Sequence, residues 1–460
     1  MKTGENAIRT NKHIPLETER LDDRIIETIY KNAEQIAEKV VRKGTKKNDW
    51  DRKLDDILTS RWLAFPVMLL LLGIILWVTI TGANYPSQVL AKFLFWGEEQ
   101  LTALLLQAGS PEWLHGFLVL GVYRCLAWVI SVMLPPIVIF FLFFTLLEDT
   151  GYLPRVAFNM DDFFRRAGCH GKQALTMCMG FGCNVAGVMS CRIIDSPREK
   201  LIAVLTNNFV PCNGRFPMLI VMAAVIAEEV SPEAYRSLAA AAIVGGIILT
   251  GVIAALTVSR ILSRTVLKGI PSFFVLELPP YRKPLVGQVI VRSIFDKVLF
   301  ALGRATVVAA PAGAAAWILA NTAIGGTSIL SHAAAFLDPL GRLMGVDGII
   351  LMAFILGLPA NETVLPFMMM GYLSTGAMIE VEGLQALRNL LVEQNGWTWI
   401  TALCVMLFSL LHYPCGTTLI TIYKETRSFK WTFLAVLIPL GIACFTCLLI
   451  AQAAALLELV

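Results

Sequence analysis

The segment KQALTMCMGFGCNVAGVMSCRIIDSPREKLIAVLTNNFVPCNGRFP, residues 172–217, is apolar enough to lie at membrane depth, yet helix-breaking residues interrupt it. Gly180, Gly182 and Gly187 fall in its first half and Pro211 in its second half. A bilayer supplies no water to an unpaired backbone group, so a broken helix is tolerated there only where protein buries it or where it lines a cavity. The segment therefore predicts a re-entrant helix followed by a broken span.

The composition of the 460-residue chain is that of a membrane protein. The chain is 56% hydrophobic and 16% charged, whereas a soluble domain carries about 25% charged residues. We therefore expect an all-α polytopic membrane protein. The first 60 residues are polar and contain no apolar core of a cleavable signal peptide. Gly168-Cys-His-Gly-Lys-Gln173 lacks the spacing and the Ser or Thr of a phosphate-binding loop, and nothing in the sequence indicates nucleic-acid binding.

Residues 1–60 form a polar arm in which apolar residues recur at helical spacing. The predicted helix could dock on a partner protein or lie on the membrane surface, and its acidic residues and lack of large aromatic residues favour the partner. Basic residues from Arg42 to Arg61 precede a first span at 62–82, so the positive-inside rule places the N-terminus in the cytoplasm. The apolar stripe consists of Leu21, Ile25, Ile29, Ile36 and Val40.

Two segments precede the broken one. Residues 88–108 have the character of an interfacial segment, with Glu98 and Glu99 outside the membrane. The apolar run 116–147 contains Pro135–Pro136, so it either crosses the membrane or folds back at the prolines. The basic loop that follows agrees with one net crossing.

The rest of the chain shows one layout twice, in opposite orientations. Basic residues on both sides of 173–191 predict re-entry from the cytoplasm, and the crossing 201–227 is broken at Pro211–Cys212. An acidic loop after 347–370 predicts re-entry from outside, and the crossing 397–423 is broken at Pro414–Cys415. Breaks within 347–370 are expected at Gly357–Pro359 and again at Pro366. Unbroken crossings are expected at 237–259, 302–320 and 431–456, and a basic cytoplasmic loop at 260–301.

Local sequence agrees with this layout. Gly180-Phe-Gly-Cys-Asn184 aligns with Gly357-Leu-Pro-Ala-Asn361, and Val210-Pro-Cys-Asn-Gly214 aligns with Tyr413-Pro-Cys-Gly-Thr417. Paired broken segments in opposite orientation are typical of an inverted-repeat transporter. The expected domains are an arm at 1–60, a first transmembrane helix with an interfacial helix at 61–110, a first repeat at 111–260, a cytoplasmic loop at 261–301 and a second repeat at 302–460.

The breaks carry residues that suit a metal ion. Cys183, Cys212 and Cys415 lie at breaks rather than on smooth helix faces, and thiolates bind Fe(II), Cu(I) and Zn(II). Packing is the alternative for these three cysteines. Packing is the expectation for the cysteines outside the breaks, since buried Cys behaves as a small hydrophobic residue. These are Cys125, Cys404, Cys444 and Cys447.

Polar residues beside the breaks have two interpretations each. Glu362 is the sole carboxylate of its apolar segment; burying it costs about 2.5–3.5 kcal/mol on insertion scales, which favours a pathway residue over a structural ion pair. Asn184 and Asn361 could coordinate an ion or cap half-helices. Arg215 could hold an unwound carbonyl or pair with Glu362, and His412 could be a ligand or a hydrogen-bonded core residue.

These motifs together resemble the transmembrane part of the bacterial ferrous-iron transport protein B family, FeoB, with its paired Gate domains. The similarity runs from about residue 17 to the C-terminus. It implies that Cys183, Cys212 and Cys415 are Fe(II) pathway residues, with Asn184 and Glu362 beside them; Asn361 is a further candidate ligand from its own position at a break. Gly180, Gly182, Pro211, Arg215, Pro359 and Pro414 are expected to be gating or structural residues. The motifs are LLEDTGYLPRVAFNMD (146–161), HGK (170–172), GFGCNV (180–185), PCNGR (211–215), LELPPYRKP (276–284), Ala-Asn-Glu (360–362) and YPCGTTL (413–419) with KET (424–426).

The sequence departs from the family pattern in three ways. The G-protein domain with which most members begin is missing, and only a stretch like its helical connector remains at about 17–50. The usual Pro-Ala after GFGCNV is Ala186–Gly187, and the usual Pro-Cys-Ser-Ala-Arg is Pro-Cys-Asn-Gly-Arg at 211–215. The usual Ala-Lys-Glu is Ala-Asn-Glu at 360–362. Loss of that lysine removes a cation from the path, so gating and metal selectivity are expected to differ from those of typical members.

The resemblance implies a multi-pass permease of the bacterial inner membrane, not an enzyme, that imports Fe(II) as substrate and binds no permanent cofactor. GTP would act only through a separate GTPase that docks on the arm and the cytoplasmic loops. An FeoA-like accessory protein, membrane lipid and a homo-oligomer are the further partners considered. Two alternatives stay open: a Gate-domain transporter of a nucleoside-like solute, and a membrane scaffold that transports nothing.

Overall fold

The computed structural model describes residues 28–37, 39–40, 55–56, 58–60, 63–169, 171–269, 285–291, 293, 298–379 and 383–457. Chain contacts divide it into two units, Met1–Leu54 and Asp55–Val460. In the first unit, residues 28–37 are helical, and the side chains of Ile29, Ile36 and Val40 are exposed. Outside the described residues lie Leu21, Ile25, most of the basic residues before the first span, the LELPPYRKP motif, and the acidic residues Glu380 and Glu382.

The second unit begins with one long helix, α3 (Ala64–Gln107). The expectation of a span at 62–82 followed by a separate interfacial segment at 88–108 is therefore wrong, since both belong to the same helix. Its 44 residues extend about 66 Å at 1.5 Å per residue, which is twice the roughly 30 Å hydrocarbon core of a bilayer. Glu98, expected to lie outside the membrane, is buried within this protein against Arg124, whose Nε donates to Glu98 Oε1 at 2.9 Å.

The run after α3 is continuous. It comprises α4 (Glu112–His115), a π-helical stretch (Gly116–Tyr123) and α5 (Arg124–Asp149). Pro135 and Pro136 lie inside α5, so the chain does not fold back there, and the run is one continuous segment long and apolar enough to cross a membrane once. Pro136 has no N–H to offer the carbonyl of Val132, one helical turn earlier.

The first repeat continues with an amphipathic helix and two broken helix pairs. Ser196 starts α9 by accepting a hydrogen bond from the Glu199 N–H, with Pro197 at the first helical position. The helices are α6 (Tyr152–Arg166), α7 (Lys172–Gly182), α8 (Asn184–Ser190), α9 (Pro197–Thr206), α10 (Phe216–Val230) and α11 (Arg236–Arg264).

The remaining elements are one short helix within the expected loop at 261–301 and the elements of the second repeat. They are α12 (Val286–Val291), α13 (Leu299–Asn321), β1 (Ala323–Ile324), β2 (Thr327–Ser328), α14 (Ile329–Leu343), α15 (Gly348–Leu356), α16 (Val364–Tyr372), α17 (Leu384–Arg388), a π-helical stretch (Asn389–Gln394), α18 (Trp399–Leu411), α19 (Gly416–Thr426) and α20 (Phe429–Leu456). β1 and β2 form an antiparallel hairpin, and α14 bends by 112° into α15.

One expected break in the second repeat is wrong. Residues 357–360 do interrupt the chain between α15 and α16, but Pro366 lies inside α16 and does not end it. The reason is its position in the first turn of that helix, where a backbone N–H has no partner within the helix and its loss costs little.

Matching backbone geometry supports the two repeats. Cys183 (φ −156°, ψ 127°) and Ala360 (φ −151°, ψ 118°) occupy aligned positions and have nearly the same extended conformation. The Gly171 N–H donates to Asp161 Oδ1 at 2.9 Å, and the Gly348 N–H donates to Asp338 Oδ1 at 3.1 Å, each across ten residues. The same bond therefore precedes the re-entrant helix in each repeat.

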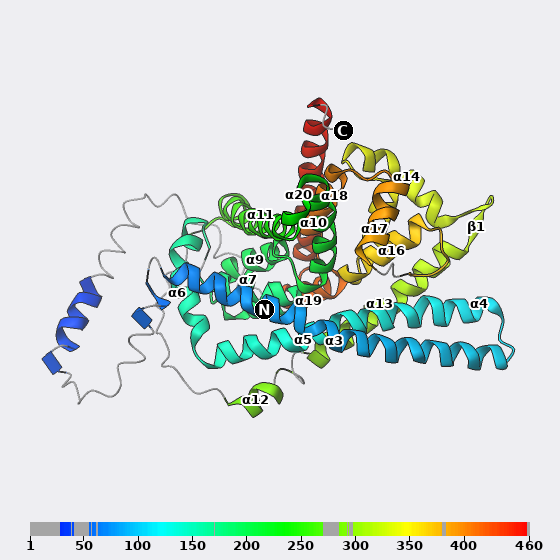
Figure 1. Ribbon diagram of the computed structural model, residues 1–460. Coiled ribbons are helices and arrows are strands. Elements are labelled where there is room, and N and C mark those ends of the chain that lie inside the picture. The colour runs from blue at the N-terminus through cyan, green and yellow to red at the C-terminus, as the bar shows by residue number, and fades with distance from the viewer. Residues whose placement is uncertain are drawn as a thin grey trace, which may run out of the picture. The chain divides into compact units, whose positions relative to one another are not determined.

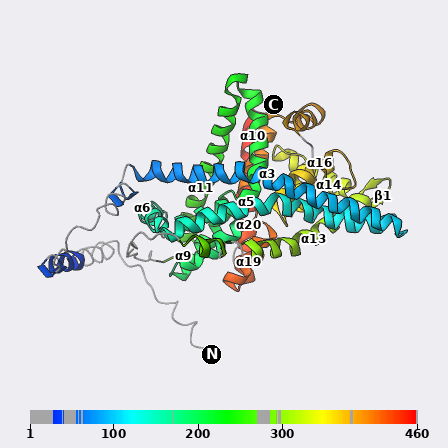
Figure 2. The ribbon, with the colours of Figure 1, turned by 60° about the horizontal axis from the view of Figure 1, so that its bottom comes forward.

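Helices of the second unit form two crossing groups. Figures 1 and 2 both show α3, α5 and α13 running in one direction while α10 and α20 run across them. The α5 helix packs against α3 and α13, and α18 packs against α10 and α20. The main hydrophobic core lies among the broken helices and includes fully buried Met222, Ile350 and Cys404.

Seven helical segments of the described residues are long and apolar enough to cross a membrane, and the bent α14–α15 pair could add one more. The spans include the broken pairs Pro197–Val230 and Trp399–Thr426. The chain is thus an all-α multi-pass membrane protein with broken helices in both repeats.

Candidate functional site

The four helix breaks meet at one cavity of about 500 Å³. Its lining includes six residues for which the sequence predicted a role in metal transport: Cys183, Asn184, Cys212, Asn361, Glu362 and Cys415. The cavity lies where the breaks approach α5, which contacts the short helical turns at 213–215 and 361–363. Residues from sequence positions 182 to 417 are thereby brought to one place.

Close packing of glycines keeps the breaks compact. A Cβ at Gly182 would lie 2.1 Å from the Phe140 ring, and a Cβ at Gly187 would lie 2.3 Å from Asn207 Nδ2. Neither position has room for a larger residue. Gly182 therefore allows α7 to approach α5, and Gly187 allows α8 to approach the second break of its own repeat.

The three thiols differ in their surroundings. Cys183 and Cys212 are buried, each with 8% of its surface exposed, and Asn361 Nδ2 lies 3.8 Å from Cys212 Sγ. Cys415 Sγ is within hydrogen-bond distance of the Thr417 and Thr418 hydroxyls, at 3.0 and 3.1 Å. These contacts position the sulfurs of Cys212 and Cys415 beside the cavity.

Two oxygen atoms at the cavity lack partners. Among the described residues, Glu362 Oε1 and Asn361 Oδ1 are shielded from solvent and accept no hydrogen bond. An unpaired buried acceptor costs about 1–3 kcal/mol, and more when it is charged. Both atoms belong to cavity-lining residues, so a cation or its water shell would satisfy them.

Arg215 holds the two repeats together and does not pair with Glu362. Its fully buried guanidinium donates to backbone carbonyls of Asn208 (2.9 Å), Leu410 (2.8 Å) and Tyr413 (3.2 Å). Arg215 thus satisfies carbonyls freed at both Pro-Cys breaks. Of the two interpretations from the sequence, the structure shows the carbonyl partner.

His412 and the two asparagines also have defined contacts. His412 Nδ1 lies 3.0 Å from the Phe408 carbonyl and 2.8 Å from the Ser409 carbonyl, so this histidine is a hydrogen-bonded core residue. Asn184 and Asn361 follow the residues that start their helical turns, and neither break shows a side-chain cap. Capping therefore does not account for these asparagines, and both line the cavity.

The cavity is not a preformed chelate. Within the described residues, no three His, Cys, Asp or Glu side chains come close enough together to hold a metal ion. Thiols and the carboxylate instead stand around a space larger than one coordination sphere. Pro211, Pro359, Pro414 and Gly180 do not line the cavity but lie at or beside the breaks.

Sequence reasoning missed part of the lining. Asn84, Ser87 and Gln88 of α3 and Gly214 and Thr417 at the breaks all line the cavity. A usable signal was present for α3, because Asn84, Ser87 and Gln88 recur at helical spacing on one side of the helix, directly after the apolar stretch 62–82.

A second cavity of about 320 Å³ shares Gly214, Asn361 and Glu362 with the first. Its other walls are mainly apolar and include Met218 and Met369. Glu362 and its neighbours therefore form the common wall of two adjoining cavities.

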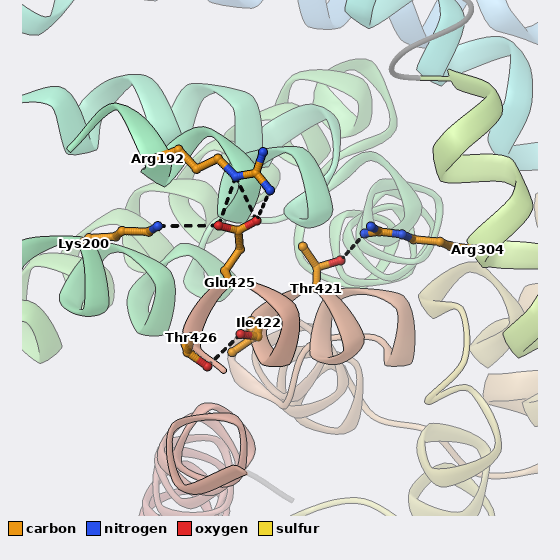
Figure 3. Close-up of polar contacts among 7 residues, drawn as sticks. All are labelled: Arg192, Lys200, Arg304, Thr421, Ile422, Glu425 and Thr426. Carbon is orange, nitrogen blue, oxygen red and sulfur yellow. Dashed lines mark hydrogen bonds and ion pairs between the residues drawn. The ribbon is translucent and has the colours of Figure 1, made fainter. Parts of the chain in front are cut away.

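An ion-pair cluster lies at the far ends of two half-helices that start at the cavity (Figure 3). Arg192 donates to Glu425 through Nη2 (2.6 Å to Oε1) and through Nε (2.9 Å to Oε1 and 3.1 Å to Oε2), and Lys200 Nζ lies 3.5 Å from Oε2. The Glu425 side chain is 6% exposed, whereas that of Arg192 is 64% exposed. The hydrogen bond to the carboxylate raises the pKa of Arg192 above its ordinary value. We call Arg192, Lys200 and Glu425 the Glu425 clamp.

Comparison with known proteins identifies two family models in the chain. The Gate model, described as nucleoside recognition, matches residues 130–227 and 302–429. A second model, described as ferrous iron transport protein B C terminus, matches residues 244–296. The first therefore covers the four breaks, and the second begins within α11.

Curated relatives match over most of the chain. An Fe(2+) transporter FeoB of Staphylococcus aureus (strain MSSA476) is 29% identical over 435 residues, covering 92% of this chain and 61% of the relative. The Fe(2+) transporter FeoB of Methanocaldococcus jannaschii is 26% identical over 441 residues, covering 93% of this chain and 62% of the relative. An Fe(2+) transport protein A/Fe(2+) transporter FeoB fusion protein of Porphyromonas gingivalis is 25% identical over 438 residues, covering 85% and 50%.

The chain thus spans about three fifths of the length of the first of these relatives. No solved structure matches the chain at a significant level.

Proposed function

The chain belongs to the ferrous iron transport protein B family, whose membrane portion it matches, and we propose that it is a permease that carries Fe(II) across the bacterial inner membrane into the cytoplasm. Transport of this kind changes the position of the ion and not its chemistry, so no catalytic residue is required. Fe(II) is the substrate and not a resident cofactor.

The observation that carries the proposal is the meeting of all four helix breaks at one cavity lined by three thiols and one carboxylate. Thiols bind borderline metals such as Fe(II), and a carboxylate balances the charge of the cation. Unwound backbone beside these side chains supplies further oxygen ligands in place of hydration water. The lack of a preformed chelate suits a pathway, because an ion that must leave cannot be held in a complete ligand shell.

The route that we propose passes Glu362. The two cavities share this residue together with Asn361 and Gly214. An ion that moves from one cavity to the other would therefore pass the unpartnered oxygens Glu362 Oε1 and Asn361 Oδ1. Cys183, Cys212, Asn184 and Cys415 line one of the two cavities and would receive or release the ion there.

Coupling is assigned to separate proteins. We propose that a separate GTPase drives or gates transport and that the N-terminus, with the arm, faces the cytoplasm, as the basic residues before the first span indicate. A small FeoA-like protein is the second proposed partner. Its support is the Porphyromonas gingivalis relative, in whose printed name an Fe(2+) transport protein A is fused to FeoB.

The test is anaerobic Fe(II) flux into liposomes that contain the chain, with and without the candidate GTPase. Glu362→Gln and Cys212→Ser should each reduce flux by about tenfold or more. Loss of a ligand interaction worth about 1.4 kcal/mol corresponds to a tenfold change. Their matched controls are Glu229→Gln, at an exposed position on α10, and Cys444→Ser, on α20 away from the cavity. Unchanged Fe(II) flux in both cavity variants, with normal protein amounts, would show that the metal pathway does not pass through this cavity.

A nucleoside-like solute is the second candidate. The Gate model's description favours it, and a cavity of about 500 Å³ falls within the range of small-molecule sites, roughly 300–1,000 Å³. Uptake of labelled uridine by the same liposomes distinguishes this candidate from Fe(II) transport. Uridine flux that survives Cys212→Ser and exceeds Fe(II) flux would favour the organic solute.

A further inference from the structure

One wall of the larger cavity comes from outside the two repeats, from the middle of α3. The lining residues there are Ile80, Ala83, Asn84, Ser87 and Gln88. They lie on one side of the helix because their spacings are three, four, seven and eight residues. Along this side the helix changes from apolar to polar at Asn84.

The polar part of this wall is not used inside the protein. The side chains of Asn84 and Gln88 are exposed and that of Ser87 is half-buried, and none of the three forms a hydrogen bond or ion pair with another described residue. Their donors and acceptors are therefore available to water or to a polar solute in the cavity that they line.

We propose that Asn84, Ser87 and Gln88 form a hydration wall that holds the water shell of the divalent cation while the thiols and Glu362 bind it from the other walls. Neutral amide and hydroxyl groups accept from and donate to coordinated water without competing for the ion as a charged ligand would. This inference rests on the proposed metal transport. The inference makes two claims that are tested separately. The first is that the hydration wall is in contact with water, and the second is that it affects Fe(II) flux.

Contact with water is tested without iron. Ser87→Cys, Gln88→Cys and Val89→Cys are treated with a small water-soluble thiol reagent, and the modified peptide is located by mass spectrometry. Residues 87 and 88 should react much faster than residue 89, which lines an apolar groove on another side of α3. Equal reaction at all three positions, or none at 87 and 88, would overturn the hydration wall whatever the protein transports.

The effect on flux is tested with a matched pair on the same helix. Gln88→Leu should lower Fe(II) flux by about tenfold, the loss of one hydrogen bond of ordinary strength. Gln100→Leu, at an exposed position of α3 away from the cavity, should leave flux unchanged. Equal flux in Gln88→Leu and wild type would overturn the proposed role. Absent flux in wild type together with fast labelling at residue 88 would instead contradict metal transport.

A second inference comes independently from the Glu425 clamp in Figure 3. Helix α8 starts directly after Cys183, helix α19 starts directly after Cys415, and the two helices pack against each other. Arg192 follows the end of α8, and Glu425 lies in the last turn of α19. The clamp thus joins the ends of two half-helices whose beginnings line the cavity.

The two ends of α19 are held differently. At its beginning, buried Arg215 binds the carbonyls of His412 and Tyr413. One turn before Glu425, Arg304 of α13 donates to the Thr421 hydroxyl at 2.7 Å. The end itself is held by the clamp, in which Arg192 is largely exposed. We infer that the clamp closes the cavity on this side and that its release lets α19 swing away from α8.

Accessibility of Cys415 tests this gate. Arg192→Gln with Lys200→Gln should speed modification of Cys415 by a membrane-impermeant maleimide added from the clamp side several-fold. The control Lys172→Gln removes a cation that pairs with Asp195 instead and should leave the rate unchanged. The swapped pair Arg192→Glu with Glu425→Arg should restore slow modification. Unchanged labelling in the double variant, with the protein folded, would overturn the gate without bearing on which solute is carried.

Discussion

Replacing Gly214 with Ala tests whether the position of the Glu362 carboxylate controls transport. A Cβ at residue 214 would lie 2.6 Å from Glu362 Oε2, and the next atoms, Glu362 Cδ and backbone N, lie at 3.5 and 3.8 Å. The clash therefore falls on the far end of a single side chain. The carboxylate must retreat by about 0.8 Å to reach an ordinary contact of 3.4 Å.

The two consequences of that shift differ in size. A side chain forced about 30° from its rotamer costs of the order of 0.5–1.5 kcal/mol, so the protein should fold normally. A reacting or coordinating group misplaced by about 1 Å loses up to about a hundredfold in rate. We therefore expect Fe(II) flux in liposomes to fall by roughly tenfold to a hundredfold, while the unfolding temperature stays close to that of wild type.

Gly245→Ala is the control for this substitution. Gly245 lies within α11, and a Cβ there meets no atom within 4 Å. Ala in a helix interior is favoured over Gly by about 0.5–1 kcal/mol, so this variant should be at least as stable as wild type and fully active. Full flux in Gly214→Ala, or an equal loss in both variants, would refute the assignment of Glu362 to the pathway.

Three further predictions follow from the breaks. Arg215→Lys should destabilise the protein by about 3 kcal/mol or more, because a compact ammonium cannot reach the carbonyls of both repeats that the guanidinium fork binds. Thermal unfolding measures this, with exposed Arg342→Lys as control, and equal unfolding temperatures would contradict it. Gly187→Ala should cost about 1–3 kcal/mol by overpacking against Asn207, and a variant as stable as Gly245→Ala would show that α8 can shift freely. Cys415→Ser should lower Fe(II) flux more than Mg(II) flux, since a hydroxyl is a poorer ligand for borderline metals; an equal fall for both ions would argue against a thiol ligand.

The breaks were predictable because their cause is local. Glycine and proline act on the backbone next to them, so the four interruptions could be placed from the sequence alone. Their cysteines and asparagines could be singled out for the same reason. The meeting of all four at one cavity followed from the repeated layout, and not from any single motif.

Other features depended on partners far away in the chain. The continuity of α3 was missed because Glu98 and Glu99 suggested a separate interfacial segment at 88–108, whereas the burial of Glu98 depends on its contact with Arg124. The short helix α14 was not predicted at all, since Pro339 lies inside it and its place depends on packing against α15. The polar face of α3 could be noticed in the sequence, but its place at the cavity could not.

The hydrogen bond from a glycine N–H to an aspartate recurs before each re-entrant helix, so matching positions of the two repeats can be compared directly. Asp161 and Asp338 each receive a backbone N–H from ten residues ahead, so one substitution can be made in either half against nearly the same local backbone. The partner positions Cys183 and Ala360 share a conformation but not a side chain. Matched variants of the two halves therefore compare a position that has a thiol with the same position without one. Two repeats with the same local backbone thus differ in the chemistry that they bring to the cavity, because Cys183 lines it and Ala360 does not.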